Sequence, residues 1–412
     1  MLTAADSSAH DQGTRPAGAL DGLRVIDAAT LAAAPMVATT MAEFGAEVIK
    51  VEQPGCGDPL RQWGTQKNGV ALMWKSVGRN KKTVTLDLRQ REGQELLRGL
   101  VAVSDVLIVN TRPGTLRRWG LTYEDLCPAN EGLVMLHVTG FGAGGPDSDR
   151  PGFGTLGEAM SGFAHLTGQK DGPPTLPPFP LADGVAALTA TNAVMMVLYH
   201  RALNGGRGQL IDVNLIEPLA RLLEHAVLTY DQLRTVLARD GNRWEVSVPR
   251  NVYRTADDRW IAMSGSTPNI AVRVFRAIGQ PDLIDHPDYR DAQRRLQNGV
   301  AIDELVAGWV ATKTLAEAID VFERHEVAAA PVYDAQQLLG DRHLQARNAY
   351  VEVPDPDLGS MTVQAPVARL SLTPGRVQRL GAAIGADNRA VYQGLLGLTD
   401  AHLEELETAG VI

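Results

Sequence analysis

Cysteine is scarce in this chain, since only Cys56 and Cys127 occur among 412 residues. Two cysteines without a paired spacing provide neither a disulfide framework nor half of a zinc cluster. The nine histidines are scattered, and no two of them form an H-x-H or H-E-x-x-H pair. We therefore expect no metal site.

An excess of basic residues is also lacking, because 39 Lys and Arg face 48 Asp and Glu, for a net charge of −9. This balance argues against nucleic acid or an anionic membrane as the main partner. We find no apolar run of the roughly 18 residues that a membrane span requires. Residues 1–17 carry neither a basic start nor the apolar segment of a signal peptide. We expect a loose tail at 1–17 and a cytoplasmic protein.

What the chain does have is a regular alternation of short apolar strands with helical patterns. Its length exceeds one ordinary core, because domains hold about 150 residues. The alternation predicts an α/β fold, with a doubly wound, mostly parallel, Rossmann-like larger domain that binds ligands at the carboxyl ends of its strands. The expected strands are 23–27, 46–52, 83–88, 104–110, 133–139 and 209–214, and the first expected helices are 35–44 and 90–103.

After residue 214 the pattern changes. We expect one long helix at 219–237, a hairpin at 253–261 and mostly helices from 269 to 326. Residues 328–332 have the composition of a linker, and a second hairpin flanks the turn at 354–357. We predict a larger domain at 18–224, a smaller α+β domain inserted at 225–328, and a linker and return to the larger domain at 329–412.

One stretch combines Pro177, Pro178 and Pro180 with Asp183 and the apolar run 185–203. Proline fixes its own φ and keeps the preceding residue out of the α region, so an extended approach should lead to a helix that starts after Asp183. An aspartate in that place is either an N-cap that accepts backbone N–H groups or an ionised nucleophile at the positive end of a helix. The stretch alone leaves both interpretations open.

The glycine-rich segment 140–145 follows an expected strand, as a dinucleotide-binding loop does. Such a loop must open a helix, whereas Gly145 is followed by PDSDRP, a sequence typical of a loop. We therefore expect a turn that lets the backbone approach a ligand rather than an NAD or FAD site. Basic residues at strand ends favour a phosphate-bearing ligand; they are Arg79, Lys81, Lys82, Arg89, Arg117 and Arg118.

Several longer motifs follow one another in order. They are LDGLRVID at 20–27, FGAEVIKVE at 44–52, NKKTVTLDL at 80–88, NTRPG at 110–114, LRRWGL at 116–121, GFG at 140–142, RPGF at 150–153, MSG at 160–162, TG at 167–168, AD at 182–183 and GRGQ at 206–209. With them the chain, from about residue 20 to its last residue, resembles the class III coenzyme A transferases. That family contains formyl-CoA:oxalate and carnitine CoA-transferases and the α-methylacyl-CoA racemases.

The resemblance implies an acyl-CoA enzyme whose catalytic aspartate is Asp183. Coenzyme A or acyl-CoA and a small carboxylic acid would be its substrates, with no permanently bound cofactor, and two ring-like subunits would interlock as a homodimer. The CoA contacts that the motifs carry over are Leu86, Arg89, Asn110, Thr111, Arg118 and Trp119. The chain departs from the family pattern at Ala32, Gln53 and Thr139, where the family has a glutamine, a basic residue and a lysine.

Both branches of the family share the aspartate, so the chemistry must separate them. A racemase needs an acid and a base on opposite faces of the α-carbon, and the resemblance aligns the racemase groups with Phe153 and, roughly, Thr267. A transferase needs one carboxylate and donors for the thioester oxygen, for which Gly140, Gly142 and Gly184 are candidates. We therefore predict an acyl-CoA:carboxylate CoA-transferase that works through an aspartyl-CoA thioester; the alternative is an α-methylacyl-CoA racemase-type isomerase.

The acid-binding pocket has six candidate lining residues: Phe153, Glu158, Arg250, Asn251, Tyr253 and Thr267. Arg250 is either a structural arginine or a bidentate clamp for a second carboxylate. The clamp would make the substrate a dicarboxylic acid, and the sequence leaves this open.

Overall fold

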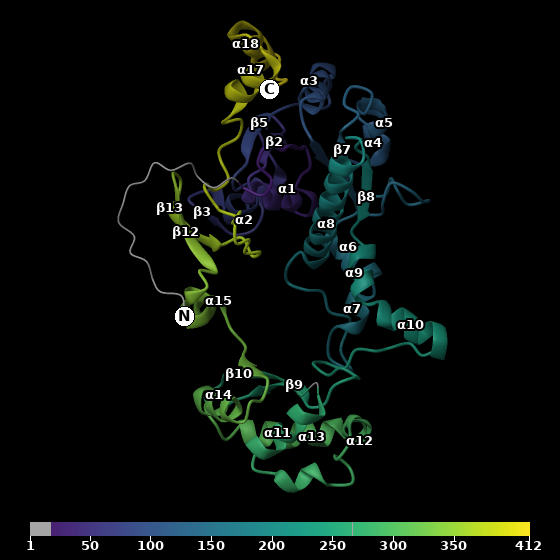
Figure 1. The fold of residues 1–412 in the computed structure, drawn as a ribbon, viewed down its shortest axis with the longest axis vertical. Helices are drawn as coiled ribbons and strands as arrows, with labels where there is room; N and C mark the ends of the chain where they lie inside the picture. Colours follow the sequence, from purple (N-terminus) through teal and green to yellow (C-terminus); the bar gives the residue numbers. More distant parts are fainter. Residues whose placement is uncertain (1–17, 266) are drawn as a thin grey trace. The chain divides into compact units, whose positions relative to one another are not determined.

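The computed structural model describes residues 18–265 and 267–412, so the tail predicted at 1–17 lies outside the described residues. The chain divides into two compact units (Figure 1). The first unit comprises the residues up to Ser161 together with Pro178–Leu222 and Ala346–Ile412, and the second comprises Gly162–Pro177 and Leu223–Gln345. Each unit has a hydrophobic core of its own.

The second unit includes residues 162–177, which the sequence prediction places in the larger domain. This segment is hydrogen-bonded to residues 239–241. The Gly241 N–H donates to the Gly168 carbonyl (2.9 Å), and the Arg239 guanidinium donates to the Gly172 carbonyl (2.8 Å). Pairing between segments so distant in the chain leaves no mark in the local sequence pattern, which is why the prediction missed it.

A six-stranded sheet, in which every neighbouring pair is parallel, forms the centre of the first unit. Its order is β5-β2-β1-β6-β7-β8. The strands are β1 (Arg24–Asp27), β2 (Glu47–Glu52), β5 (Lys82–Thr85), β6 (Val106–Val109), β7 (Val134–Thr139) and β8 (Leu210–Asn214). Each overlaps a predicted strand, and the prediction of an α/β fold with a parallel sheet is confirmed.

Helices cover both faces of this sheet (Figure 1). Successive strand residues point to opposite faces, so Ile108 of β6 packs in the core beneath one pair of helices and Leu107 in the core beneath another. The first pair is α1 (Ala33–Glu43) and α8 (Leu181–Leu203); the second is α3 (Arg91–Ala102) and α17 (Asn388–Leu396). Buried on both faces, the strands are held by apolar burial worth about 25 cal/mol per Å².

Shorter elements complete the first unit. The predicted hairpin around the turn at 354–357 is confirmed as β12 (Tyr350–Asp355) paired with β13 (Gly359–Gln364). The others are η1 (Pro59–Gln62), β3 (Gln66–Lys67), β4 (Val70–Ala71), α2 (Leu72–Val77), α4 (Pro113–Trp119), α5 (Tyr123–Leu126), α6 (Gly154–Met160), α9 (Glu217–Leu222) and α18 (Asp400–Thr408).

By length and composition alone, α8 is apolar enough to cross a membrane, with a hydropathy of 1.6. The prediction that no run reaches this length is therefore wrong by this measure. One such helix is weak evidence, because a helix packed on a sheet passes the same test. Ala186, Ala190 and Val194 of α8 are fully buried in the core it shares with α1 and the sheet.

The second unit has a three-stranded antiparallel sheet, β9 (Arg250–Arg254), β10 (Trp260–Ser264) and β11 (Ala329–Pro331). The predicted hairpin is confirmed, whereas the linker predicted at 328–332 is a strand that pairs with β10. Its helices are α7 (Phe163–Leu166), α10 (Glu224–Leu233), α11 (Pro268–Ala277), η2 (Pro281–Ile284), α12 (Ala292–Gln297), α13 (Gly299–Val310), α14 (Leu315–Arg324), α15 (Ala335–Gly340) and α16 (Arg342–Ala346).

The prediction of a single helix at 219–237 is also wrong, because two helices, α9 and α10, occupy this segment. Leu223 has ψ of 15° and separates α9 from α10, and the boundary between the two units falls beside it. The apolar period continues across this break, because apolar residues three or four positions apart run through it: Leu219, Leu223, Val227 and Tyr230. Periodicity therefore could not reveal the change of direction.

Candidate active site

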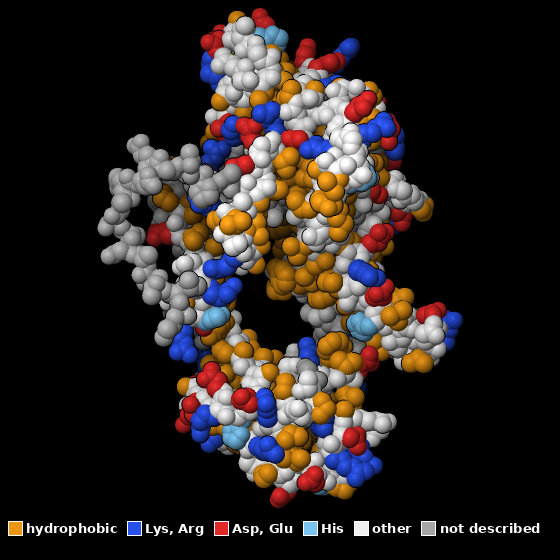
Figure 2. Space-filling model, viewed as in Figure 1, with side chains coloured by type: hydrophobic (Ala, Val, Ile, Leu, Met, Phe, Trp, Pro, Cys, Tyr) orange, Lys and Arg blue, Asp and Glu red, His pale blue; other side chains and the backbone are white. Residues whose placement is uncertain are grey.

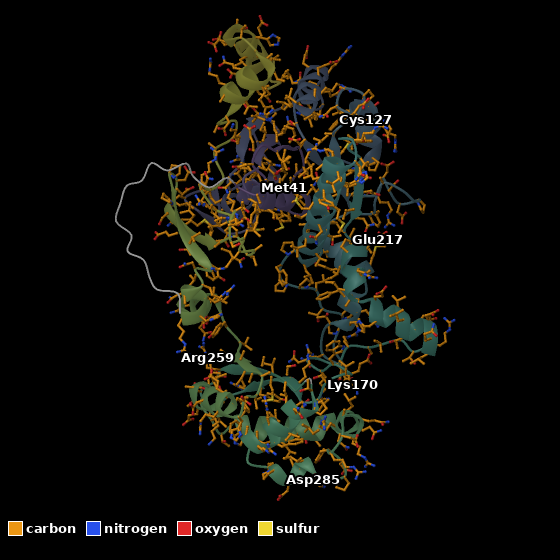
Figure 3. All side chains as sticks on the ribbon, in the orientation of Figure 1. Met41, Cys127, Lys170, Glu217, Arg259 and Asp285 are labelled. Carbon is orange, nitrogen blue, oxygen red and sulfur yellow. The ribbon has the colours of Figure 1, made fainter. Side chains whose placement is uncertain are left out.

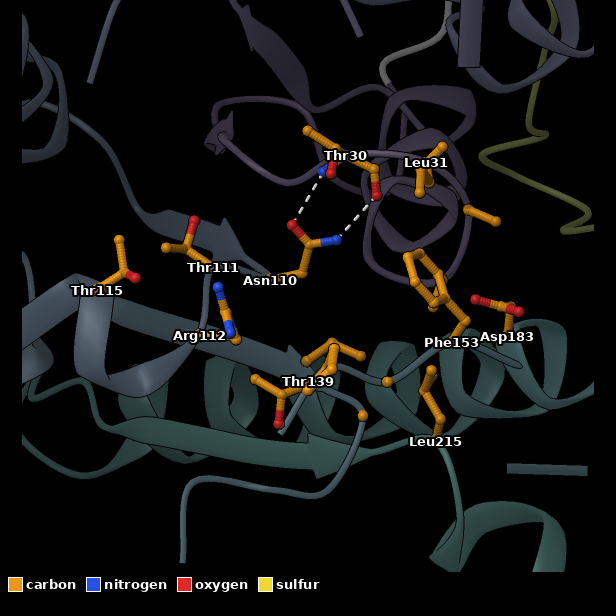
Figure 4. Close-up of a pocket in the computed structure, with 16 residues that line it drawn as sticks. Thr30, Leu31, Asn110, Thr111, Arg112, Thr115, Thr139, Phe153, Asp183 and Leu215 are labelled. Atoms are coloured by element: carbon orange, nitrogen blue, oxygen red, sulfur yellow. Dashed lines mark hydrogen bonds between the residues drawn. The ribbon is translucent and has the colours of Figure 1, made fainter. Parts of the chain in front are cut away.

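A hollow of about 510 Å³ lies at the carboxyl ends of β1, β6, β7 and β8 in the first unit (Figure 4). This is the edge at which ligands bind in parallel α/β sheets. Asp183 is the one carboxylate among the residues that line it. The walls are residues 30–33, 110–112, 138–140 and 151–153, with Thr115, Asp183 and Leu215.

Asp183 is the third residue of α8, which begins at Leu181 after Pro180 in the N-cap position. The interpretation of Asp183 as an N-cap is therefore wrong, and the expectation that the helix starts after it is wrong as well. The helix begins three residues earlier than we predicted, at Leu181 rather than after Asp183. The N–H groups of Asp183 itself and of Ala33, the first residue of α1, instead act on the carboxyl by lowering its pKa. Both N–H groups belong to the first turn of a helix.

Burial first, and then the nearby charge of Glu158, raise the pKa of Asp183 to about 6, although the backbone N–H groups of Asp183 and Ala33 act to lower it. A carboxyl with this pKa is ionised at neutral pH, yet it is more basic than an exposed aspartate. A perturbed carboxylate that lines a hollow is the kind of group that serves as a nucleophile.

The loop that supplies Ala33 is fixed on both sides. Asn110 binds the backbone of Thr30 twice: its side-chain oxygen accepts from the Thr30 N–H (3.0 Å) and its amide donates to the Thr30 carbonyl (2.9 Å) (Figure 4). Leu31 has φ of +66°, a left-handed conformation that is unusual for leucine. Its N–H donates to the buried carboxylate of Asp58 (3.0 Å). Sequence reasoning named Ala32 of this loop only as a departure from the family pattern and predicted none of these contacts, because small and apolar residues carry no chemical signature.

Two of the predicted oxyanion donors are already engaged. The Gly184 N–H donates to the Pro180 carbonyl inside α8 (3.0 Å), and the Gly142 N–H donates to the Thr139 hydroxyl (2.9 Å). Gly140 lines the hollow. Thr139, at a position where the family pattern has a lysine, therefore fixes the glycine-rich turn, and the Ala33 N–H is a backbone group near enough to the carboxyl to lower its pKa.

The residues predicted to bind CoA fall into two groups. Asn110 and Thr111 line the hollow. The other four do not line it: Leu86 is buried, Arg89 pairs with Asp87, Arg118 donates to the Thr115 hydroxyl (2.9 Å), and Trp119 packs at the edge of the core. Their role in CoA binding stays a prediction.

Arg112 is the cation that lines the hollow, and the sequence did not predict it as a site residue although it belongs to the motif NTRPG at 110–114. Figure 4 shows Phe153 beside Asp183 at one end, with Thr111 and Arg112 toward the other. Glu158 is 3% exposed and contacts the start of α8 rather than the hollow. Arg250 lies in the second unit, where it lines a separate hollow of about 600 Å³.

Asn251 and Tyr253 of the second unit both donate to Asp303, so their polar groups are part of a buried cluster. Thr267 caps α11. Among the described residues, no three His, Cys, Asp or Glu are grouped as a metal site requires. Cys127, labelled in Figure 3, and the exposed Cys56 are both free thiols.

Comparisons with known proteins agree with this site. A sequence model of CoA-transferase family III matches residues 20–388. The chain is 39% identical over 399 residues to a succinyl-CoA–D-citramalate CoA-transferase of Chloroflexus aurantiacus, covering 97% of this chain and 99% of the relative. It is also 39% identical over 404 residues to the beta subunit of a succinyl-CoA–L-malate CoA-transferase of the same organism, covering 97% and 100%.

A solved structure gives the same result. The crystal structure of a CAIB/BAIF family protein from Brucella suis superimposes with a TM-score of 0.81 and 27% identity, covering 92% of this chain and all of that one. A family match over nearly the whole chain, with a carboxylate at the carboxyl edge of a parallel sheet, leads to one assignment: the protein belongs to CoA-transferase family III and is a CoA-transferase.

Proposed function

We propose that the enzyme moves CoA from an acyl-CoA to a free carboxylic acid through a covalent aspartyl-CoA thioester on Asp183. The observation that carries this proposal is the single carboxylate of the hollow, which is ionised at neutral pH and shares the hollow with Ala33 at the start of α1. A nucleophile, a backbone donor and room for a thioester are what acyl transfer requires.

The reaction starts when an Asp183 carboxylate oxygen attacks the thioester carbonyl carbon. The C–S bond breaks, CoA leaves as a thiolate, and a mixed anhydride remains on the aspartate. The thiolate then attacks the aspartyl carbonyl carbon, the anhydride C–O bond breaks, and the donor acid leaves as a carboxylate. The acceptor acid repeats these steps in reverse. One thioester is broken for each one made, so the exchange consumes no ATP.

The orientation of CoA follows from the charges along the hollow. Arg112 and Thr111 lie away from Asp183 (Figure 4), and arginine suits phosphate groups because its planar fork donates two parallel hydrogen bonds. We propose that the phosphates of CoA lie toward Arg112 and that its thioester reaches Asp183. The predicted contacts at Leu86, Arg89, Arg118 and Trp119 extend this path along the first unit.

The test is an ATP-free transfer assay by mass spectrometry, with an acyl-CoA panel and free acids, on the parent and on Asp183→Ala. Transfer by the parent, its loss in Asp183→Ala and a hydroxylamine-trapped modification of Asp183 support the mechanism. Substantial transfer by Asp183→Ala would overturn it. Exchange of the α-proton with deuterated water, without a second acid, would instead support the racemase alternative, for which Phe153 provides no proton-transfer group.

We propose a dicarboxylic acid as a substrate, because the two relatives carry the names of D-citramalate, L-malate and succinyl-CoA enzymes. Arg250 is the candidate clamp for the second carboxylate. Its guanidinium donates to the Asn242 carbonyl (2.7 Å) and lines a hollow of the second unit with Asn251. Loss of a buried clamp costs about 2–5 kcal/mol. Arg250→Ala should therefore lose dicarboxylate turnover and keep that of monocarboxylates; equal loss of both would exclude the clamp.

We propose a homodimer with interlocked subunits. Apolar side chains gather over α8 in Figure 2, where Leu188, Met196 and Tyr199 are each about 70% exposed. Contiguous apolar surface of this kind is typical of an interface. Interlocked subunits cannot separate without partial unfolding, so sedimentation should detect no folded monomer on dilution to nanomolar concentration. A stable monomer there would contradict the interlocked arrangement.

A further inference from the structure

The start of α8 has no side-chain cap of its own, because proline occupies the N-cap position. The first N–H groups of a helix have no partner inside the helix and need one from elsewhere. Glu158 of α6 is such a partner: its Oε1 atom accepts from the N–H of Ala182 (3.3 Å) and from that of Leu181 (3.1 Å), which also donates to the Phe179 carbonyl (2.8 Å). A buried carboxylate from another helix therefore binds the two N–H groups that precede Asp183 in α8.

Two glycines let α6 approach this closely. A Cβ at Gly154 would overlap Oδ2 of Asp183, and a Cβ at Gly157 would lie 3.1 Å from the Cβ of Ala182 and still closer to the Leu215 carbonyl. Gly154 and Glu158 are four residues apart, so they share one face of α6. On this face, Gly154 leaves room for the Asp183 carboxyl, and Glu158 accepts hydrogen bonds from the backbone at the start of α8.

The position of Glu158 has an electrostatic consequence. An aspartate in the first turn of a helix is ordinarily stabilised in its ionised form by free N–H groups. Here Glu158 takes two of these groups, and its own charge raises the pKa of Asp183. The other charged groups on the elements around α8 are Glu43 of α1, His137 of β7, Asp212 of β8, and Glu217 and Arg221 of α9, with Arg112 across the hollow.

We propose that Glu158 is a positioning residue for CoA transfer: it binds the N–H groups at the start of α8 and thereby leaves the Asp183 carboxylate free to face the acyl-CoA. The inference rests on the proposed function of Asp183. Glu158 makes and breaks no covalent bond in the reaction. Its effect is to occupy the N–H groups of Leu181 and Ala182, which would otherwise be open to Asp183, and to make the nucleophile more basic. A more basic oxygen attacks a carbonyl faster.

Two variants separate its contributions. Glu158→Gln keeps a carbonyl oxygen that can accept the Leu181 and Ala182 N–H groups but removes the charge, whereas Glu158→Ala removes both. Glu217→Gln is the matched control, because it removes an exposed carboxylate from α9, which also packs against α8.

The first measurement does not depend on catalysis. An infrared titration of ¹³C-aspartate-labelled protein, taken as the difference from Asp183→Asn, reports the protonation of Asp183. We expect the midpoint of the parent and of Glu217→Gln near pH 6, and that of Glu158→Gln about one pH unit lower. An unchanged midpoint in Glu158→Gln would overturn the proposal.

The second measurement is the pH profile of kcat for transfer. In Glu158→Gln the acidic limb should move to lower pH, and the plateau should fall about 3-fold, as expected for a nucleophile with a Brønsted coefficient near 0.5. Glu158→Ala should fall further, with KM for acyl-CoA within about twofold of the parent. Parent-like kcat in Glu158→Ala would also overturn the proposal. If the midpoint shifts in Glu158→Gln but the parent protein transfers no CoA, the proposed function is refuted, whereas the electrostatic coupling of the two carboxyls is supported.

Discussion

Asp183 is held between opposing influences. Two backbone N–H groups favour its ionised form, while burial and the charge of Glu158 disfavour it, and the second pair prevails. The proposed reaction benefits, since the carboxylate is basic yet ionised at neutral pH. The stability of the folded chain decreases, because an ionised group in a partly buried place costs free energy.

This conflict predicts that Asp183→Asn inactivates and stabilises the protein at once. The pKa of Asp183 is about 6 in the folded chain, against 3.8 for an unperturbed aspartate. The folded state therefore binds more protons between these values, and stability falls as pH rises through 6. At pH 8 the ionised carboxyl costs on the order of 3 kcal/mol. Denaturant unfolding should show Asp183→Asn to be more stable than the parent at pH 8, with the difference disappearing near pH 4.

Asp87 provides the control, since hydrogen bonds from the Arg89 side chain lower its pKa to about 2. Here the folded state favours the ionised form, so its stabilising effect is present at neutral pH and is lost as pH falls toward 2. Asp87→Asn should therefore lower stability at pH 8. If both variants changed stability in the same direction, the assigned pKa of Asp183 would be wrong.

A second prediction concerns Gly154. Its alanine variant places a methyl group where Oδ2 of Asp183 lies, so the carboxylate must move. A displacement of about 1 Å can cost 100-fold in rate, and we expect at least this loss in kcat with the fold retained by circular dichroism. Gly184→Ala is the matched control: a Cβ there meets no atom within 4 Å. Similar activity in both variants would show that Gly154 does not shape the site.

At this scale the sequence pointed to Asp183, the proposed nucleophile, and to part of its surroundings, since the predicted residues Asn110, Thr111, Gly140 and Phe153 also line the hollow. Asp183 was found through a motif match, whereas its helical position and the Ala33 N–H depend on how two helices meet. Backbone donors have no residue type, so no pattern could predict them. Arg112 could have been found, since it follows a strand end directly, as Asn110 and Thr111 do.

At the scale of elements, the sequence predicted the buried strands correctly and failed for a strand at the edge of a sheet. The strands of the parallel sheet were predicted because residues buried on both faces form continuous apolar runs. The predicted linker at 328–332 failed for a related reason. It contains three alanines and a proline, which resemble a connection, yet Ala329–Pro331 pairs with β10 at the edge of its sheet. Edge strands tolerate proline, so composition alone could not distinguish the two.

Helix α1, which begins at Ala33, and the loop before it are held in place by buried ion pairs. Lys81 and Asp27 are both fully buried and lie 2.9 Å apart, and Lys81 also donates to the Pro35 carbonyl of α1 (2.7 Å). Lys50 bridges Asp27 and Asp58, at 3.8 and 2.8 Å. Because Asp58 binds the Leu31 N–H, these ion pairs connect the sheet to the loop beside the nucleophile.

Removing one partner of these buried ion pairs should therefore lower the free energy of unfolding strongly. Lys81→Met leaves Asp27 with less compensation in a buried place, for which losses of about 3–5 kcal/mol are typical. Urea unfolding at pH 7.5 measures the loss. The neighbouring Lys82→Met is the control, because its pair with Glu47 is more than 30% exposed on both sides and should contribute less than about 1 kcal/mol. Equal effects at the two positions would contradict a special role for the buried pair.

At the scale of the whole molecule, one helix of the described residues, α10, does not pack into a hydrophobic core. α10 of the second unit has no buried residue, although Val227, Leu228 and Leu233 are apolar and more than half exposed. Isolated helices of ten residues are marginal in water, so a partner surface would account for an ordered α10. The proposed homodimer offers one.

Leu233→Glu should therefore weaken the assembly rather than the fold of a single unit. Leu233 is 71% exposed within one chain, so a surface substitution there would change stability by at most about 0.5 kcal/mol if the protein were a monomer. In a dimer that buries it, a charge without a partner is costly, and sedimentation at micromolar concentration should show dissociated or aggregated chains with a lowered Tm. Gln232→Glu adds the same charge at the exposed neighbouring position and should leave both measurements unchanged. A dimer of parent-like Tm in Leu233→Glu would place α10 outside the interface.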